Sequence, residues 1–365
     1  MLVSMCRSLP PHESVECVLQ NDLTKATGCY HASGFMAIAA RSFAKINIGL
    51  RIGRLREDGF HELRTIYQTL AIHDVVKVDA IRGIGIEIYC KNPRVPADET
   101  NTCWRVAERV LHILKVRNKV RIAIEKNLPV QGGMGAASSN AVATMLALEK
   151  ALKLQLTAAD RLRIATEVGS DLPLFLLGGT ALGTGHGEQV YPLEDLPGIP
   201  CVVATPPIGV STPAAFAAWD KRLAEQPKLT ASRASDTINE FSHSVYEWLG
   251  RSNGSSTGVP EKSWDRAETL LLDLVRAGIE NDFETVVFSM YPAIREVKRV
   301  LERSGARYSS LSGSGSTVYG LFADQETAAK AAAVLNEKDI PAQATTTLTR
   351  VEYWKEMFGK LPKLP

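Results

Sequence analysis

The chain has 365 residues, which is long enough for two domains and a sizeable hydrophobic core. Its 42 Lys and Arg residues nearly balance its 40 Asp and Glu residues, and the net charge of +2 gives no general reason to expect nucleic acid or an acidic membrane surface as a partner. No apolar run approaches the roughly 18–20 residues of a membrane span, and neither a CxxC pair nor histidines at metal-ligand spacing are present, so we expect a cytoplasmic protein with reduced cysteines.

The first 35 residues show no clear periodicity and lack the apolar core of a signal peptide. A much better patterned stretch opens at Met36, so we expect residues 1–35 to be a disordered extension and consider Met36 a candidate start of the protein. Strand-like patterns then alternate with helical ones. The strands are expected near 38–52, 74–89 and 118–125, and the helices near 103–116, 140–150 and 157–168. This pattern predicts an α+β first domain that ends near residue 195.

The segment 42–53 has the alternation of a strand with two different faces. Its even positions are apolar, whereas Lys45, Asn47 and Arg51 share the opposite face. Such a strand could present Lys45 and Asn47 to a cleft, and a solvent-facing lysine is the alternative.

An Asp58-Gly59 turn follows this strand and leads into Phe60 and His61. Phe60 could stack on a flat ring while His61 forms hydrogen bonds with its edge. The alternative is a core phenylalanine beside a surface histidine.

The most informative segment runs from Leu128 to Asn140 and joins a strand to a helix through small residues. Its three glycines permit close backbone approach, and the helix start directs unpaired N–H groups at whatever binds there, which favours a phosphate. Ser138, Ser139 and Asn140 are natural first-turn and capping residues. A Walker loop is excluded because no Gly-Lys-Ser/Thr follows, and a dinucleotide fingerprint fits poorly. A glycine-rich turn without a ligand is the alternative.

Two later segments carry polar groups in constrained loops. Asp171, in Gly169-Ser170-Asp171-Leu172-Pro173, could cap a helix or act as a base. The loop 311–319, rich in Ser and Gly, is either a tight turn or a support for the first loop and for a substrate's polar groups.

A strand at Cys201–Thr205 opens a second region of the chain. Helical patterns follow at 263–278, 292–304 and 325–337, and the polar segment 221–262 is expected to be a mobile surface insertion.

Together these segments resemble the GHMP kinase superfamily. The resemblance covers about residues 40–350 and is carried by Ala44-Lys45-Ile46-Asn47, Asp58-Gly59-Phe60-His61-Glu62-Leu63, the glycine loop, Gly169-Ser170-Asp171-Leu172-Pro173-Leu174-Phe175, Gly187-Glu188 and the late Ser-Gly-Ser-Gly loop. Within the superfamily, the chain is similar to the kinases that act on a cytidyl-diphosphate methylerythritol. Phe60 stands where these kinases commonly have Tyr, and Ala136 and Ala137 replace two glycines.

The resemblance implies a two-domain α+β fold. A ribosomal-S5-like ATP-binding domain would span 36–195, and a ferredoxin-like α/β domain with an insertion near 221–262 would span 196–365. It also implies ATP-dependent phosphorylation of the substrate's 2-hydroxyl, in the non-mevalonate route to isopentenyl diphosphate, by a monomer or homodimer.

By the same resemblance, Asp171 accepts the hydroxyl proton and Lys45 holds that carboxylate ionised. The ATP phosphates would contact Pro129, Gln131, Gly132, Gly133, Met134, Gly135, Ala136, Ala137, Ser138 and Ser139. Asn101 and Lys126 would contact the adenine, although Asn101 could simply cap the next helix. The cytidyl substrate would contact Asn47, Phe60, His61, Thr212 and Phe216, the last as a second wall for the cytosine. Mg²⁺ should arrive on ATP, with Ser139 as a protein ligand.

Two other functions stay open. One is a GHMP kinase for a mevalonate-type or homoserine-type alcohol, against which the Asp58–His61 segment argues because those substrates offer no ring to stack. The other is a non-catalytic binding protein of this fold, against which the presence of both Lys45 and Asp171 argues.

Overall fold

The computed structural model describes residues 37–130, 132–225, 241, 243 and 279–359. The predictions for residues 1–35, for Gln131 and for a helix at 263–278 lie outside these ranges. Within them, no helix is long and apolar enough to cross a membrane. The cysteines at positions 90, 103 and 201 are free thiols, as expected.

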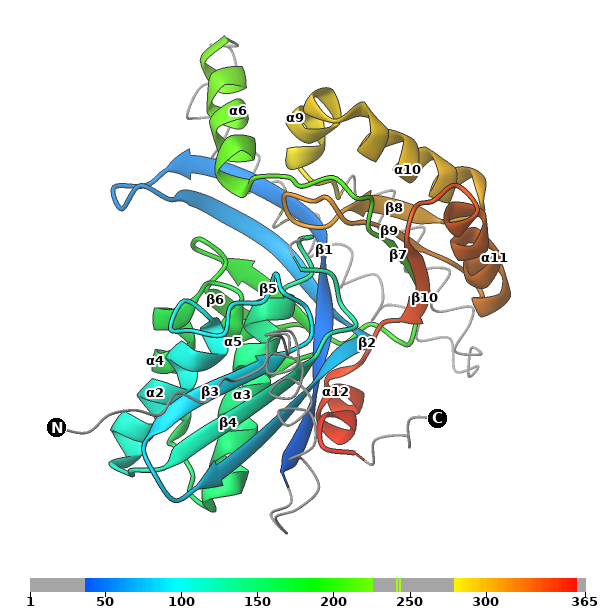
Figure 1. Cartoon of the computed structure of the whole chain (residues 1–365). Helices are drawn as coiled ribbons and strands as arrows, with labels where there is room; N and C mark the ends of the chain where they lie inside the picture. The colour runs from blue at the N-terminus through cyan, green and yellow to red at the C-terminus, as the bar shows by residue number, and fades with distance from the viewer. Residues whose placement is uncertain (1–36, 131, 226–240, 242, 244–278, 360–365) are drawn as a thin grey trace, which may run out of the picture. The chain divides into compact units, whose positions relative to one another are not determined.

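The first sheet is built on a long antiparallel hairpin of β1 (Ile38–Leu55) and β2 (His61–Ile81) (Figure 1). The other edge of β2 pairs with β5 (Thr180–Thr184) in its first half and with β4 (Lys119–Glu125) in its second half. Strand β3 (Gly85–Cys90) is parallel to β4, and β6 (Gln189–Pro192) is antiparallel to β5. The strand expected at 74–89 is therefore two strands, which Gly83 and Gly85 separate with positive φ angles.

Four helices pack with this sheet: α2 (Thr102–Leu114), α3 (Ala136–Leu152), α4 (Ala158–Val168) and α5 (Leu172–Leu177). Residues 139–149 of α3 are all buried, because α2 and α5 cover the helix on the sides that do not face β1 and β2. The start of α3 is thus held rigidly between the sheet and its neighbours.

The second sheet contains β7 (Pro200–Ala204), β8 (Tyr308–Leu311), β9 (Val318–Leu321) and β10 (Ala342–Thr346). Its order is β10-β7-β9-β8, with every pair antiparallel. Helices lie between β7 and β8 and between β9 and β10 in the chain, so the topology is ferredoxin-like as expected. These helices are α6 (Thr212–Glu225), α9 (Phe283–Met290), α10 (Pro292–Arg303) and α11 (Gln325–Asn336).

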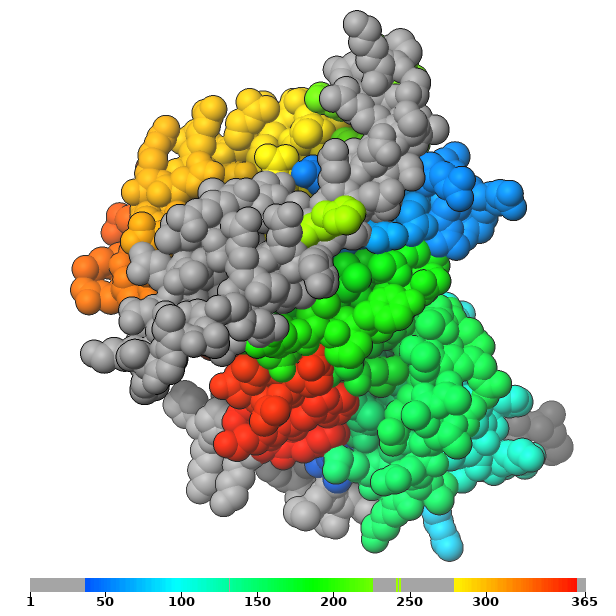
Figure 2. All heavy atoms as spheres, turned by 180° about the vertical axis from the view of Figure 1, so that it is seen from behind, coloured from blue at the N-terminus to red at the C-terminus, as the bar shows by residue number. Residues whose placement is uncertain are grey.

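The C-terminal helix packs with the first domain, although the expected division at residue 195 assigns it to the second. Helix α12 (Arg350–Met357) buries Tyr353 and Met357 in the core of the first sheet, and the Tyr353 hydroxyl donates to the carbonyl of Phe175 at 2.7 Å. Figure 2 shows α12 in red against the green segments of the first domain. The range 196–365 is therefore too long for the second domain, because α12 supplies apolar surface to the first.

The β1–β2 hairpin also reaches both cores. Leu50 and Ile52 pack into the core of the second sheet, and Leu50 forms a backbone bridge with Asn281. In the segment expected to be a surface insertion, residues 221–225 are the mostly exposed end of α6, whereas Phe241 is buried against β1, so the expectation of a surface position is wrong at Phe241. The hairpin therefore positions groups from both sheets around one site.

Candidate active site

The glycine loop leads directly into the start of α3. The helix begins at Ala136, earlier than expected, and its cap is Gly135 with φ of 66° and no side-chain hydrogen bond. Of the residues expected in the first turn or at the cap, Ser138 lies in the first turn. The capping part of the expectation is wrong, because Ser138, Ser139 and Asn140 all lie inside the helix. Ala136 and Ala137 adopt helical φ angles that a methyl group tolerates. The first-turn N–H groups have no side-chain cap, which leaves them available to an anion.

A cavity of about 370 Å³ opens at this helix start. Asn101, Lys126 and Asp171 line it together with the predicted loop residues Pro129, Gly132, Gly133, Gly135, Ala136, Ala137 and Ser138. Met134 and Ser139 are buried and lie outside this lining. Met134 instead accepts the Lys45 backbone N–H at 3.0 Å, which ties the loop to β1.

The Ser-Gly-Ser-Gly loop packs directly on the glycine loop. Thr317 donates its N–H to the carbonyl of Gly132 at 3.2 Å, and the Ser312 hydroxyl donates to that of Gly133 at 2.9 Å. A Cβ on Gly133 would lie 2.2 Å from the Ser312 carbonyl oxygen, so this contact requires glycine. Of the two alternatives for the late loop, the structure supports the one in which it holds the first loop.

Lys45 lies in the interior, with 4% of its surface exposed, so the alternative of a solvent-facing lysine is wrong. Its ammonium nitrogen lies 2.7 Å from Oδ1 of Asn47 and 3.4 Å from Oδ2 of Asp171. A buried ammonium needs such partners because desolvation disfavours an isolated charge. The two residues expected to be catalytic thus form an ion pair beside the glycine loop.

Asp171 precedes α5, but its carboxylate makes no capping hydrogen bond and its side chain is 29% exposed. Asp171 is thus the N-cap residue of α5 by position only, and its carboxylate can accept a proton from a ligand in the cavity that it lines.

Tyr67, which the sequence analysis missed, lies against the same pair. Its hydroxyl is 3.3 Å from Oδ1 of Asp171, and the Lys45 ammonium lies 5.3 Å from its ring centroid. Burial, and secondly the charge of Asp171, raise the pKa of Tyr67 well above its ordinary value, so the hydroxyl remains a donor. Only the register of the hairpin, which places Tyr67 opposite Asn47, reveals this contact.

Asn47 has a different position from the one expected. Its amide oxygen accepts from Lys45, and its amide nitrogen donates to the Thr65 hydroxyl at 2.9 Å. Both ends of the amide are engaged and the residue is 2% exposed. The structure therefore places Asn47 behind Lys45, where it holds the ammonium rather than substrate hydroxyls.

Asn101 and Lys126 have structural partners at the edge of the cavity. Asn101 caps α2 by accepting the Cys103 N–H at 2.9 Å and also donates to the Pro96 carbonyl at 2.7 Å, so its capping alternative is confirmed. Lys126 forms an ion pair with the fully buried Asp74. A contact of either residue with adenine stays a prediction.

The aromatic residues expected to hold cytosine, Phe60 and Phe216, do not form two free walls on either side of a base. His61 is buried and stacks on Phe216 with ring centroids 5.0 Å apart, and its Nε2 lies 2.8 Å from Oδ1 of Asp220. Phe216 also packs edge-on against Phe283, so it is not a free second wall. Phe60 is 55% exposed, which leaves its ring as the accessible platform. The alternative of a core phenylalanine beside a surface histidine is thus wrong, because Phe60 is exposed and His61 is buried.

Thr212 stands at the first position of α6, and its hydroxyl lies 2.8 Å from that of Ser314. This contact brings the start of α6 to the Ser-Gly-Ser-Gly loop, so polar groups from both sheets converge beside the glycine loop.

The expected metal ligand does not fit. Ser139 is 2% exposed and lies outside the lining of the cavity. In the part of the chain that the structure describes, no group of three or more His, Cys, Asp or Glu side chains could hold an ion.

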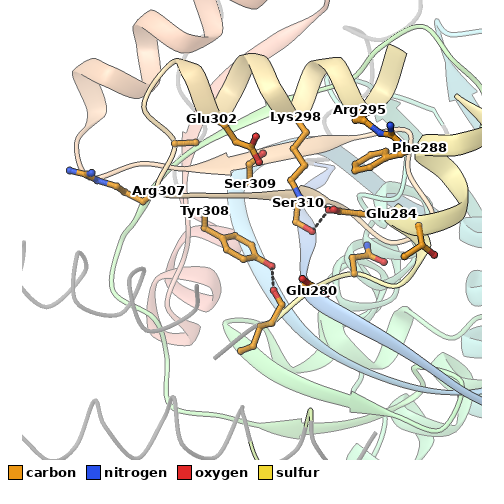
Figure 3. Close-up of a pocket in the computed structure, with 14 residues that line it drawn as sticks. Glu280, Glu284, Phe288, Arg295, Lys298, Glu302, Arg307, Tyr308, Ser309 and Ser310 are labelled. Atoms are coloured by element: carbon orange, nitrogen blue, oxygen red, sulfur yellow. Dashed lines mark hydrogen bonds and ion pairs between the residues drawn. The ribbon is translucent and has the colours of Figure 1, made fainter. Parts of the chain in front are cut away.

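A second cavity, of about 570 Å³, lies between β8, α9 and α10 (Figure 3). Two of its charged groups pair with each other: Glu284 accepts from Lys298 at 2.6 Å and also from the Ser310 hydroxyl at 2.8 Å. The cavity contains none of the residues singled out from the sequence, so it is not the candidate active site.

Two family models match separate segments of the chain. The model described as GHMP kinases N terminal domain matches residues 101–179, and that described as GHMP kinases C terminal matches residues 265–340. The first match contains the glycine loop and Asp171, and the second contains the Ser-Gly-Ser-Gly loop.

Curated relatives and a solved structure match most of the chain. The 4-diphosphocytidyl-2-C-methyl-D-erythritol kinase of Solibacter usitatus is 34% identical over 81% of this chain and 85% of its own length. The kinase of the same name from Geobacter sulfurreducens is 32% identical over 84% and 97%. The crystal structure of a 4-(cytidine 5'-diphospho)-2C-methyl-D-erythritol kinase matches with a TM-score of 0.63 and 29% identity, covering 85% of this chain and 98% of the other.

Proposed function

The chain belongs to the 4-diphosphocytidyl-2-C-methyl-D-erythritol kinases of the GHMP superfamily, and from this premise we propose how its own residues carry out the reaction. The activity is transfer of the γ-phosphoryl group of ATP to the 2-hydroxyl of 4-diphosphocytidyl-2-C-methyl-D-erythritol in the non-mevalonate route to isopentenyl diphosphate. The products are the 2-phosphate and ADP.

The observation that carries the proposed mechanism is the Lys45–Asp171 ion pair beside the glycine-loop cavity. Phosphoryl transfer needs positioning and charge stabilisation more than covalent chemistry. The uncapped start of α3 binds the phosphates, and Asp171 accepts the proton of the attacking hydroxyl. Lys45 draws the attacking oxygen toward the γ-phosphate while Asn47 holds its ammonium in place.

The cytidyl end of the substrate belongs at Phe60. Its exposed ring offers a stacking face, while His61, Phe216 and Asp220 support the hairpin beneath it. Mevalonate and homoserine have no ring to occupy this face.

We propose that the enzyme acts in the cytoplasm as a monomer or homodimer, and that Mg²⁺ enters with ATP as the nucleotide complex.

The experiment is phosphorus NMR of the full chain with ATP, Mg²⁺ and the cytidyl-diphosphate alcohol. A new phosphomonoester and ADP are expected, with mevalonate and homoserine as control substrates. Phosphorylation of either control at a comparable rate, or no turnover of the cytidyl substrate, would contradict the proposed function.

A further inference from the structure

The turn between β5 and β6, residues 185–188, lies against two parts of the site. Gly185 and Gly187 have φ angles of 71° and 103°. A Cβ on Gly187 would lie 2.6 Å from the Tyr67 hydroxyl, and one on Gly185 would lie 2.6 Å from the carboxylate oxygens of Glu188. The turn can approach these groups only because both positions are glycine, and it presents His186 between them.

One side of His186 faces the platform proposed for the base. Its ring stacks on Phe60 with centroids 4.9 Å apart and planes inclined by 29°. Phe60 comes from the β1–β2 turn and is 55% exposed, so a ligand ring can still stack on it. Aromatic contacts of this geometry stabilise the position of both rings.

The Nδ1 edge of the His186 ring faces the loop that carries Asp171. Its Nδ1 lies 2.8 Å from the hydroxyl of Ser170, which immediately precedes Asp171. The turn itself is held by Glu188, whose Oε2 accepts the His186 backbone N–H at 2.7 Å and lies 3.4 Å from Nδ1. The carbonyl of Gly187 is also within 3.3 Å of the Tyr67 hydroxyl that contacts Asp171.

One imidazole thus joins the ring that receives the base to the loop that carries the proton acceptor. We propose that His186 is a positioning residue that couples recognition of the cytosine to the placement of Asp171. This inference rests on the proposed function, because it requires Phe60 to receive a base. It assigns two separable roles to one side chain: ring stacking supports substrate affinity, and the Ser170 hydrogen bond supports turnover.

Two substitutions separate these roles. His186→Phe keeps a ring on Phe60 and removes the partner of Ser170, so kcat should fall about two- to tenfold while KM for the cytidyl substrate stays within twofold. His186→Asn keeps a hydrogen-bonding group near the position of Nδ1 and removes the stack. It should raise KM for the cytidyl substrate by about two- to tenfold with kcat nearly unchanged. KM for ATP should stay within twofold in both.

His186→Ala should show both defects, and calorimetry should show weaker binding of CDP. CDP binding is measured without turnover, so it tests the stacking role independently of catalysis. Failure of the wild-type enzyme to phosphorylate the cytidyl alcohol would count against the proposed function and not against the stacking role. His112→Ala, at an exposed histidine of α2, is the matched control and should leave all these values within twofold.

The inference is overturned if His186→Ala leaves CDP affinity, kcat and KM within twofold of wild type. It is also overturned if the Phe and Asn variants show the same kinetic defect, or if KM for ATP rises as much as KM for the cytidyl substrate, because a merely structural residue would produce those patterns. Melting curves of all variants identify any loss of folding. If His186→Ala does not fold, the Phe and Asn variants decide the question.

Discussion

The ammonium nitrogen of Lys45 lies 3.4 Å from Oδ2 of Asp171. The lysine comes from β1 and the aspartate from the loop before α5, and both are held by further contacts. Asn47 binds the ammonium, and Tyr67 lies against Oδ1 of the carboxylate. The pair is therefore placed before substrate binds, which reduces the reorganisation needed during phosphoryl transfer.

Asp171→Asn should keep the fold and the affinity for ATP but lower kcat by about 10² or more, because loss of a general base typically reduces rates by 10²–10⁴. Steady-state kinetics and a melting curve test this. Asp339→Asn is a suitable control, since Asp339 is exposed and Asn tolerates its φ of 57°. A variant that turns over near the wild-type rate would show that Asp171 is not the base.

Lys45→Ala should also lose most of its activity, because the attacking oxygen loses its cationic partner. The Lys45→Ala/Asp171→Asn double variant should lose less activity than the product of the two single losses, since groups that act as a unit are not additive. A complete double-mutant cycle in kcat measures this. Fully multiplicative losses would mean that the two residues act independently.

Tyr67→Phe should lower kcat by about two- to tenfold, the range expected for loss of one hydrogen bond. KM for ATP should not change, because Tyr67 is outside the lining of the nucleotide cavity. Stopped-time assays at saturating substrates are sufficient. An unchanged kcat would show that the 3.3 Å contact with Asp171 does not matter for catalysis.

Phe60→Ala should raise KM for the cytidyl substrate by about 5- to 150-fold, because stacking on a base is worth about 1–3 kcal/mol. Phe60→Tyr keeps the ring and should be nearly neutral. His61→Ala should instead lower the melting temperature, since His61 is buried, stacked on Phe216 and bound to Asp220. A higher KM for ATP in Phe60→Ala would place this ring at the nucleotide end.

Gly133→Ala should destabilise the protein and raise KM for ATP. The new methyl group would meet the Ser312 carbonyl at 2.2 Å, in addition to the strain of a φ of 78°. Gly59→Ala is the matched control, with φ of 82° but no atom within 4 Å of the new Cβ, so it should show only the conformational strain of roughly 1–2 kcal/mol. Equal melting temperatures for the two variants would exclude tight packing of the loops as the cause.

Several features could be predicted from the sequence because they depend on neighbouring residues. The alternation around Lys45 predicts a strand with two faces, and the small residues after Leu128 predict a strand, an open loop and a helix start. The structure confirms the strands expected near 38–52, 118–125 and 201–205 and the helices expected near 103–116, 140–150, 157–168, 292–304 and 325–337, with small shifts of their ends. Local propensity and hydrophobic periodicity act within one element, so they can be read from one stretch of chain.

Other features depend on how distant segments meet, and only the tertiary structure decided them. The hairpin register places Tyr67 opposite Asn47, the packing of the loop before α5 brings Asp171 to its hydroxyl, and the meeting of two turns brings His186 to Phe60. Packing also exposed Phe60 and buried His61, and it placed α12 in the first core. The sequence by itself identified Lys45, Asp171 and the glycine loop as groups suited to one site. That they meet, and which hydrogen-bond partners they have, followed from long-range packing, which no local pattern records.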